Sequence, residues 1–190
     1  MDKENKPSKV DSKKARRALT SAGLAPERQS ILAENLEIID FFEDHVSEQD
    51  AILARECKQR PEAILLQTIP GVGDVAALML IAEIGDVTRF RKAQDVAAFV
   101  GLVPRVYSSA QTRRTGNITK HGSAMLRWVM VQAAWMAIRR SAALKERYAR
   151  ISKRRGKRVA AVAIARTLVE IAYHVLKDKK GFEESKLALG

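Results

Sequence analysis

Several features are scarce in this sequence, and each absence excludes a class of protein. Aromatic residues make up 5% of the chain, and no useful run alternates apolar with polar residues, so a large β-sheet is not expected. The single cysteine, Cys57, cannot form an internal disulfide and fits a reducing cytoplasm, where a thiol is usually buried or inert. The polar N-terminal segment has no apolar core, which excludes a signal peptide.

Long hydrophobic runs and cofactor motifs are also missing. The longest apolar stretch, 159–176, is interrupted by Arg166, Glu170 and His174, which argues against a membrane span. There is no Walker loop and no dinucleotide fingerprint, and His, Cys, Asp and Glu show no metal-site spacing. We therefore expect no cofactor in this chain and no membrane partner, and we expect a cytoplasmic location.

What the sequence does contain is concentrated charge. The formal net charge is +12. Between Arg105 and Arg158 there are fifteen Lys and Arg residues and one acid, Glu146, whereas residues 30–56 carry eight acids and one base, Arg55. Positive charge gathered on one segment favours a polyanionic partner, most often nucleic acid, over a basic face that serves only solubility.

Apolar periodicity predicts an all-α fold in which a long N-terminal helix precedes a compact helical domain, with room for a small hairpin within 104–118. Four apolar residues of the acidic helix predicted over 29–60 recur every seven positions, which is the spacing of a coiled coil: Leu32, Ile39, Val46 and Leu53. Such a stripe suits packing on the chain's own core as well as on a second chain. We expect a flexible tail at 1–28, the compact domain at 61–180 and a C-terminal tail at 181–190.

Two further patterns concern the compact domain. The segment "TIPGVGD" (68–74) is typical of a helix-hairpin-helix element, in which Gly71 and Gly73 let the backbone approach a phosphate. A tight turn between two helices, with glycines needed only for geometry, is the alternative.

Trp128 and Trp135 lie seven residues apart on an apolar helix predicted over 123–139. Because their neighbours are apolar, we expect core anchors rather than bases stacked on the rings.

The segment "PRVYSSAQTRRTGNITKHG" (104–122) gathers cations around a serine pair. A serine becomes a useful nucleophile when a base removes its proton and cations stabilise the phosphate that it attacks. Guanidinium groups match phosphate oxygens in bidentate fashion. From chemistry alone, however, a basic DNA-contact loop with incidental serines is favoured over catalysis, and His121 is more often a surface residue than a base.

Three blocks, in this order, resemble a known family: "LLQTIPGVGDVAALMLIAEIGDVTRF" (65–90), "AQDVAAFVGLVPRVYSSAQTRRTGNITKHGSAMLRWVMVQAAW" (93–135) and the basic helical tail. They are similar to the C-terminal transposase domain of the IS110/IS116 insertion-sequence family, over roughly 62–180. The resemblance implies a DNA transposase whose catalytic serine attacks a DNA phosphodiester and becomes covalently linked. It also implies a structured guide RNA, an oligomeric assembly, and an N-terminal nuclease-like domain with four magnesium-binding acids.

Carried onto this sequence, the resemblance assigns the nucleophile to Ser109, with Ser108 as the backup. It assigns phosphate binding to Arg105, Arg113, Arg114 and Lys120. Together with the two glycines and the remaining basic positions, the nucleic-acid-binding set that we predict is Gly71, Gly73, Arg105, Arg113, Arg114, Lys120, Arg127, Lys153, Arg154, Arg155, Lys157 and Arg158.

The sequence departs from the family pattern in three places. Ala110 replaces the usual Gly after the serine, and Ser123 stands where Asn is usual. Nothing in residues 1–60 offers strands bearing the nuclease carboxylates, so the chain looks like a fragment or a truncated copy. Magnesium is then expected only with the missing domain, and we expect nucleic-acid binding without autonomous transposition. The alternatives are a non-catalytic helix-hairpin-helix binding protein derived from a transposase, and an interaction module that assembles through its acidic helix.

Overall fold

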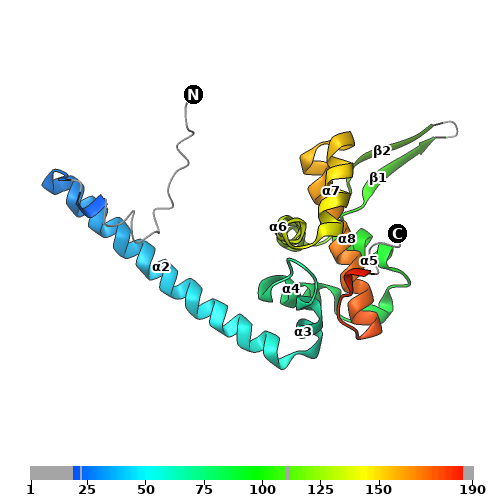
Figure 1. Cartoon of the computed structure of the whole chain (residues 1–190), viewed down its shortest axis with the longest axis horizontal. Helices are drawn as coiled ribbons and strands as arrows, with labels where there is room; N and C mark the ends of the chain where they lie inside the picture. The colour runs from blue at the N-terminus through cyan, green and yellow to red at the C-terminus, as the bar shows by residue number, and fades with distance from the viewer. Residues whose placement is uncertain (1–18, 22, 110–111, 186–190) are drawn as a thin grey trace. The chain divides into compact units, whose positions relative to one another are not determined.

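The computed structural model describes residues 19–21, 23–109 and 112–185, and the chain divides into two units, 1–52 and 53–190. The expected all-α fold is confirmed, with one two-stranded antiparallel hairpin inside the range predicted for it (Figure 1). The elements in chain order are α2 (Pro26–Gln59), α3 (Pro61–Gln67), α4 (Asp74–Ile84), the 3-10 turn η1 (Val87–Arg89), α5 (Ala93–Val100), β1 (Pro104–Ser109), β2 (Thr112–Ile118), α6 (Ala124–Arg140), α7 (Ala142–Arg155) and α8 (Lys157–Asp178).

Helix α2 confirms the long acidic helix and begins three residues before the predicted start. Glu27 in its first turn and Lys58 in its last turn both complement the helix dipole. Five large apolar side chains of α2 are more than half exposed: Ile31, Ile38, Phe41, Phe42 and Val46. A coiled-coil partner for this helix stays a prediction. Most of the predicted N-terminal tail, residues 1–18 and 22, lies outside the described residues.

Helix α8 forms the centre of the second unit. Its buried residues come from most of its circumference, and α3, α5, α6 and α7 all pack against it. The ring of Tyr173 is buried, and its hydroxyl lies 3.1 Å from the carbonyl oxygen of Arg91 and accepts a hydrogen bond from Lys177 Nζ at 2.8 Å. The hydrogen bond to Arg91 joins α8 to the segment between η1 and α5.

Helix α8 is also long and apolar enough to cross a membrane by length and composition, and it is the one described helix that meets this test. Inside the protein, however, 56% of its apolar window is buried. Core helices of water-soluble proteins share this composition, and we interpret α8 as a core helix.

The turn between α3 and α4 is fixed by a close approach to α6. Gly71 has φ +86°, and a Cβ added there would overlap the carbonyl oxygen of Ala133 and lie 2.7 Å from the nitrogen of Ala137. Pro61 opens α3 as its first residue, and Gly85 ends α4, both as the sequence predicts. The small residues on both sides let the turn and the helix meet backbone to backbone.

A second close approach holds the base of the hairpin, which we define as residues 100–105 and 119–123. Gly101 ends α5 with φ +80°, and a Cβ there would overlap the backbone of His121. Gly122 has φ +70°, and a Cβ there would overlap the carbonyl oxygen of Phe99. The amide of Thr119 donates to Val103 O at 2.9 Å, and the amide of Lys120 donates to Gly101 O at 3.2 Å. The two chain segments therefore cross in direct contact.

Arg127 links this hairpin base to α6. Its Nη1 donates to three carbonyl oxygens, those of Val100 at 3.1 Å, His121 at 2.6 Å and Gly122 at 3.0 Å. Ser123 caps α6 by accepting a hydrogen bond from the amide of Leu126 at 3.2 Å. One guanidinium thus orients both segments from which the hairpin strands emerge.

Replacing Gly71 with Ala is expected to destabilise the protein by about 2 kcal/mol or more, because the positive φ and the overlap with α6 both oppose a side chain. Urea unfolding followed by circular dichroism measures this loss. Gly73→Ala is the matched control, since Gly73 has φ −104° and nothing within 4 Å of an added Cβ. Its loss should stay below about 1 kcal/mol. Equal losses at the two glycines would contradict the close approach.

Replacing Arg127 with Met is expected to loosen the hairpin base, because partly buried carbonyls would lose charge-assisted hydrogen bonds worth about 1–3 kcal/mol in total. Hydrogen exchange at the amides of Thr119 and Lys120 should become at least about fivefold faster. Arg139→Met, at an exposed position of the same helix, is the control and should leave both amides unchanged. Unaltered exchange in Arg127→Met would show that the guanidinium does not hold the base.

Candidate nucleic-acid interface

The serine pair lies on strand β1, next to the end of the hairpin (Figure 1). The register of the two strands places Ser108 opposite Arg113 and Ser109 opposite Thr112. Arg114 stands opposite Tyr107, one step nearer the base. The side chains of residues 106–115 lie outside the described part of the chain. The choice of Ser109 over Ser108, and the phosphate-binding roles of Arg113 and Arg114, stay predictions.

Three ionisable side chains are exposed at the hairpin base: Arg105, Lys120 and His121. Arg105 Nη2 donates to Thr119 O at 3.3 Å, which leaves most of its guanidinium donors available. Lys120 has φ +58°, a conformation that costs about 1 kcal/mol or more in a residue with a side chain. The backbone crossing described above holds Lys120 in this conformation, directly after strand β2.

A second group of exposed cations surrounds the junction of α7 and α8: Lys153, Arg154, Arg155, Lys157 and Arg158. Gly156 separates the two helices with φ +84° and caps α8 without a side-chain hydrogen bond. The first turn of α8 contains no acid. Its unpaired amides therefore add to the positive potential of the five side chains.

These cations are not neutralised within the described residues. The ion pairs recorded there join Arg60 to Glu56 and Arg166 to Glu170, away from both groups. Arg127 is different, because its Nη1 is held by the three carbonyls of the hairpin base. The geometry gives Arg127 a structural role, and its contact with nucleic acid stays a prediction.

The glycine turn offers less to a phosphate than the two basic groups. Gly71 faces the backbone of α6, which occupies the space that a ligand would need. Gly73 is exposed at the start of α4, but Asp74 in the first turn supplies its own negative charge and accepts a hydrogen bond from Gln67 at 2.5 Å. Packing accounts for Gly71, and the helix-hairpin-helix interpretation stays a prediction.

The expectation that both tryptophans are core anchors is wrong. Trp128 is 60% exposed and Trp135 is 37% exposed. The buried face of α6 is made instead by smaller or aliphatic residues: Leu126, Val129, Met130, Ala133, Ala134 and Ala137. Polar Gln132 and Arg139, which lie four residues after Trp128 and Trp135, mark this outer face in the sequence. That polar spacing is the signal that could have revealed the exposure.

The family of this chain follows from comparison with known proteins. The family described as "Transposase IS116/IS110/IS902 family" matches residues 63–149, a segment that includes the hairpin, α6 and half of α7. The transposase for insertion sequence element IS1111A of Coxiella burnetii is 29% identical over 87% of this chain and 46% of its own length. A probable family 20 transposase of Pseudomonas aeruginosa is 30% identical over 84% of this chain and 50% of its own.

A pilin gene-inverting protein of Moraxella bovis is also similar, with 28% identity over 77% of this chain and 48% of its own length. The chain thus spans about half the length of the curated relatives that it matches. The order of the matched blocks and the family match over the hairpin and its flanking helices lead to one assignment. This chain belongs to the IS116/IS110/IS902 family of transposases.

Proposed function

We propose that this chain is the DNA-binding, C-terminal part of an insertion-sequence transposase and supplies the serine nucleophile for DNA strand cleavage and rejoining. One observation carries the proposal: the family match spans a hairpin on which a serine pair stands opposite Arg113 and Thr112 in the strand register. The exposed cations at the hairpin base and at the α7–α8 junction support it. Both groups lie in the same structural unit as the hairpin.

In the proposed step, Ser109 Oγ attacks the phosphorus of a DNA phosphodiester. A bond forms between Oγ and phosphorus, the bond from phosphorus to one bridging oxygen breaks, and the serine proton passes to water. The departing DNA oxygen takes up a proton, and a phosphoserine–DNA linkage remains. Attack on this linkage by a DNA hydroxyl reverses the step and rejoins a strand.

The cations serve two purposes in this step. In the proposal, Arg113, which stands opposite Ser108 in the strand register, offsets the negative charge that develops in the transition state. Arg105 and Lys120 lie farther along the hairpin from Ser109 and bind other phosphates of the same backbone. The five cations at the α7–α8 junction bind the DNA backbone without reading its sequence. In the proposal, DNA binding and strand chemistry thus use separate groups of residues in the same unit.

The described residues do not fit a metal site. They contain no group of three or more His, Cys, Asp or Glu side chains that could hold a metal ion. No step of the proposed reaction uses a metal ion held by these residues. In the proposal, magnesium, its acidic ligands and half of the composite site come from the nuclease-like domain, and a guide RNA and a homo-oligomeric assembly complete the machinery. This chain alone is expected to bind nucleic acid without transposing it.

The affinity of the chain for duplex DNA should fall steeply with rising salt, because cations that contact phosphates release bound counterions. The double variant Lys153→Gln, Arg154→Gln should flatten the plot of log affinity against log salt by about 1.8, at about 0.9 per lost contact. Fluorescence anisotropy with a labelled duplex across a salt series measures both quantities.

The matched control is Arg55→Gln, Lys58→Gln, which removes two exposed cations from the acidic helix α2. Its salt slope should equal that of the wild type. If both double variants change the slope equally, the effect comes from net charge rather than from a site at the end of α7. Salt-independent or undetectable binding by the wild type would favour the interaction module instead.

Ser109→Ala should abolish a covalent protein–DNA adduct that the wild type forms with an activated substrate. The substrate is a pool of random-sequence duplexes with a sulfur atom in the bridging position, because a thiolate departs without a proton and lessens the need for the nuclease-like domain. SDS electrophoresis measures the amount of covalent adduct, because only covalent complexes survive it. Fluorescence anisotropy measures binding separately.

Ser108→Ala is the control, and it should keep both the adduct and the affinity. An adduct lost in Ser108→Ala and kept in Ser109→Ala would move the nucleophile by one residue. Duplex binding without any adduct in the wild type, also in the presence of a nuclease-like domain from a relative, would favour the non-catalytic binding protein.

A further inference from the structure

Helix α6 leaves large apolar side chains uncovered in the part of the chain that the structure describes. Met125 and Trp128 are each 60% exposed, Trp135 is 37% exposed and Met136 is 38% exposed. Positions 125, 128, 132 and 135 follow the three- and four-residue steps of one helix face. We call Met125, Trp128, Trp135 and Met136, together with the exposed Gln132 between the two tryptophans, the tryptophan stripe. An uncovered face of this kind on a folded domain marks a binding surface.

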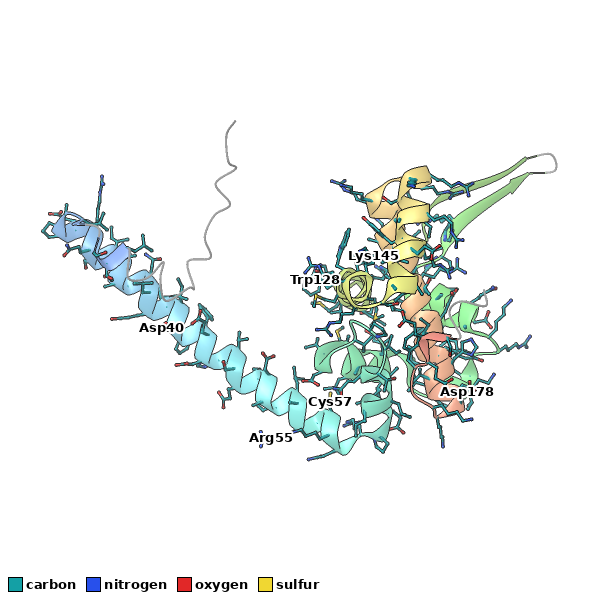
Figure 2. The ribbon with its side chains drawn as sticks, viewed as in Figure 1. Asp40, Arg55, Cys57, Trp128, Lys145 and Asp178 are labelled. Carbon is teal, nitrogen blue, oxygen red and sulfur yellow. The ribbon has the colours of Figure 1, made fainter. Side chains whose placement is uncertain are left out.

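The tryptophan stripe borders the basic helix α7. The rings of Trp135 and Tyr148 meet edge to face, with centroids 5.6 Å apart, and α6 packs beside α7. Figure 2 shows Trp128 on α6 and Lys145 on the adjacent α7. Residues 124–155 carry nine Lys and Arg residues and one acid, Glu146. The exposed cations of the two helices are Arg139, Arg140, Lys145, Arg150, Lys153, Arg154 and Arg155.

We infer that the tryptophan stripe binds an unpaired nucleic-acid strand, with bases stacked on Trp128 and Trp135 and phosphates paired with the exposed cations of α7. Indole rings stack on any base, because every base has a π face, and basic surfaces beside such rings are how single strands are held without sequence reading. The inference rests on the proposed function, to which it adds a site for the unpaired strand.

The charge around the stripe decides between classes of partner. A protein covering four apolar side chains would place its own rim against the surrounding cations, and that rim would have to be strongly acidic. Each nucleotide of a nucleic-acid strand has both a flat ring for the apolar side chains and a negative phosphate for the cations. Duplex DNA does not suit the indoles, because its bases are stacked on one another and present only their edges.

The spacing of the two indoles sets the length of strand that they contact. Seven residues of α-helix rise about 10 Å, which is about the rise of three stacked nucleotides at 3.4 Å each. The rings therefore stack on bases that are not neighbours, and Gln132 lies between them with an amide that can bond to a base edge. Single-stranded DNA and unpaired RNA share this chemistry, and separate titrations distinguish them.

The experiment uses the intrinsic fluorescence of the chain, because Trp128 and Trp135 are its two tryptophans. Fluorescence is titrated with oligothymidylate, with oligouridylate and with a blunt duplex, at one low salt concentration. Stacking should quench the emission with the single strands. The stronger of the two single-strand responses identifies DNA or RNA as the source of the strand. The duplex should bind through the cations and quench little.

Trp128→Ala should weaken single-strand binding, measured by anisotropy, at least about fivefold, and Trp128→Phe should retain most of the affinity because it keeps a ring. Duplex affinity should stay unchanged in both. Ile64→Ala, which truncates a side chain that is 50% exposed on α3, is the matched control and should bind like the wild type. Because Trp128 is exposed, its loss should not unfold the domain, and circular dichroism checks this.

Two results would overturn the inference and leave the proposed function standing. In the first, Trp128→Ala binds single strands as well as the wild type does, while duplex binding keeps its salt dependence. In the second, Trp128→Ala changes the oligomeric state in sedimentation without changing strand affinity, which assigns the stripe to a protein partner such as a second copy. A wild type that binds neither duplex nor single strands would remove the proposed function as well.

Discussion

The burial of α8 is the constraint on which the second unit depends. Ten of its residues are buried, from Ala160 near its start to Val175 near its end, and four other helices pack against them. Because most of the circumference of this helix is buried, its exposed charged side chains lie mainly at its two ends. Lys157 and Arg158 stand in the first turn, where exposed charge and unpaired amides act together. The core therefore determines where the basic surface can form.

The hairpin depends on a different device, the contact between two backbones. Gly101 and Gly122 both lie at positive φ, and each approaches the other chain segment too closely for a side chain. Arg127 adds three hydrogen bonds across the same crossing. Strands of six and seven residues gain little stability by themselves. The contacts at the base, rather than those between the strands, therefore hold the hairpin to the helices.

The helices and their ends could be predicted from the sequence because glycine and proline mark them. Pro61, Gly85, Gly101 and Gly156 stand at helix boundaries where local chemistry alone decides the outcome. The inner face of α6 could not be predicted in the same way. Its alanines are buried because the α3–α4 turn approaches so closely at Gly71, and this approach joins residues more than sixty positions apart in the chain. The sequence predicts the two tryptophans in the core, whereas three alanines share the buried face of α6 with Leu126, Val129 and Met130.

The residues of the candidate nucleic-acid interface likewise divide into those that the sequence reveals and those that need the fold. The cations of the serine segment and of the α7–α8 junction could be recognised from charge and composition, since exposed charge needs no tertiary information. The roles of Gly71 and Arg127 required the fold, because both residues contact backbone atoms that are distant in sequence or hidden within a turn. Glycine beside a ligand and glycine beside a helix have identical sequence signatures.

Charge segregation along the chain has a consequence for assembly. The surface of α6, α7 and the start of α8, where the strand is proposed to bind, is basic, whereas residues 30–56 of α2 carry eight acids and one base. Yet α2 exposes Ile38, Phe41, Phe42 and Val46, and apolar side chains beside carboxylates suit a protein surface rather than phosphates. The exposed apolar side chains of α2 and those of the tryptophan stripe thus stand in opposite charge environments. Carboxylates accompany those of α2, and cations border those of α6.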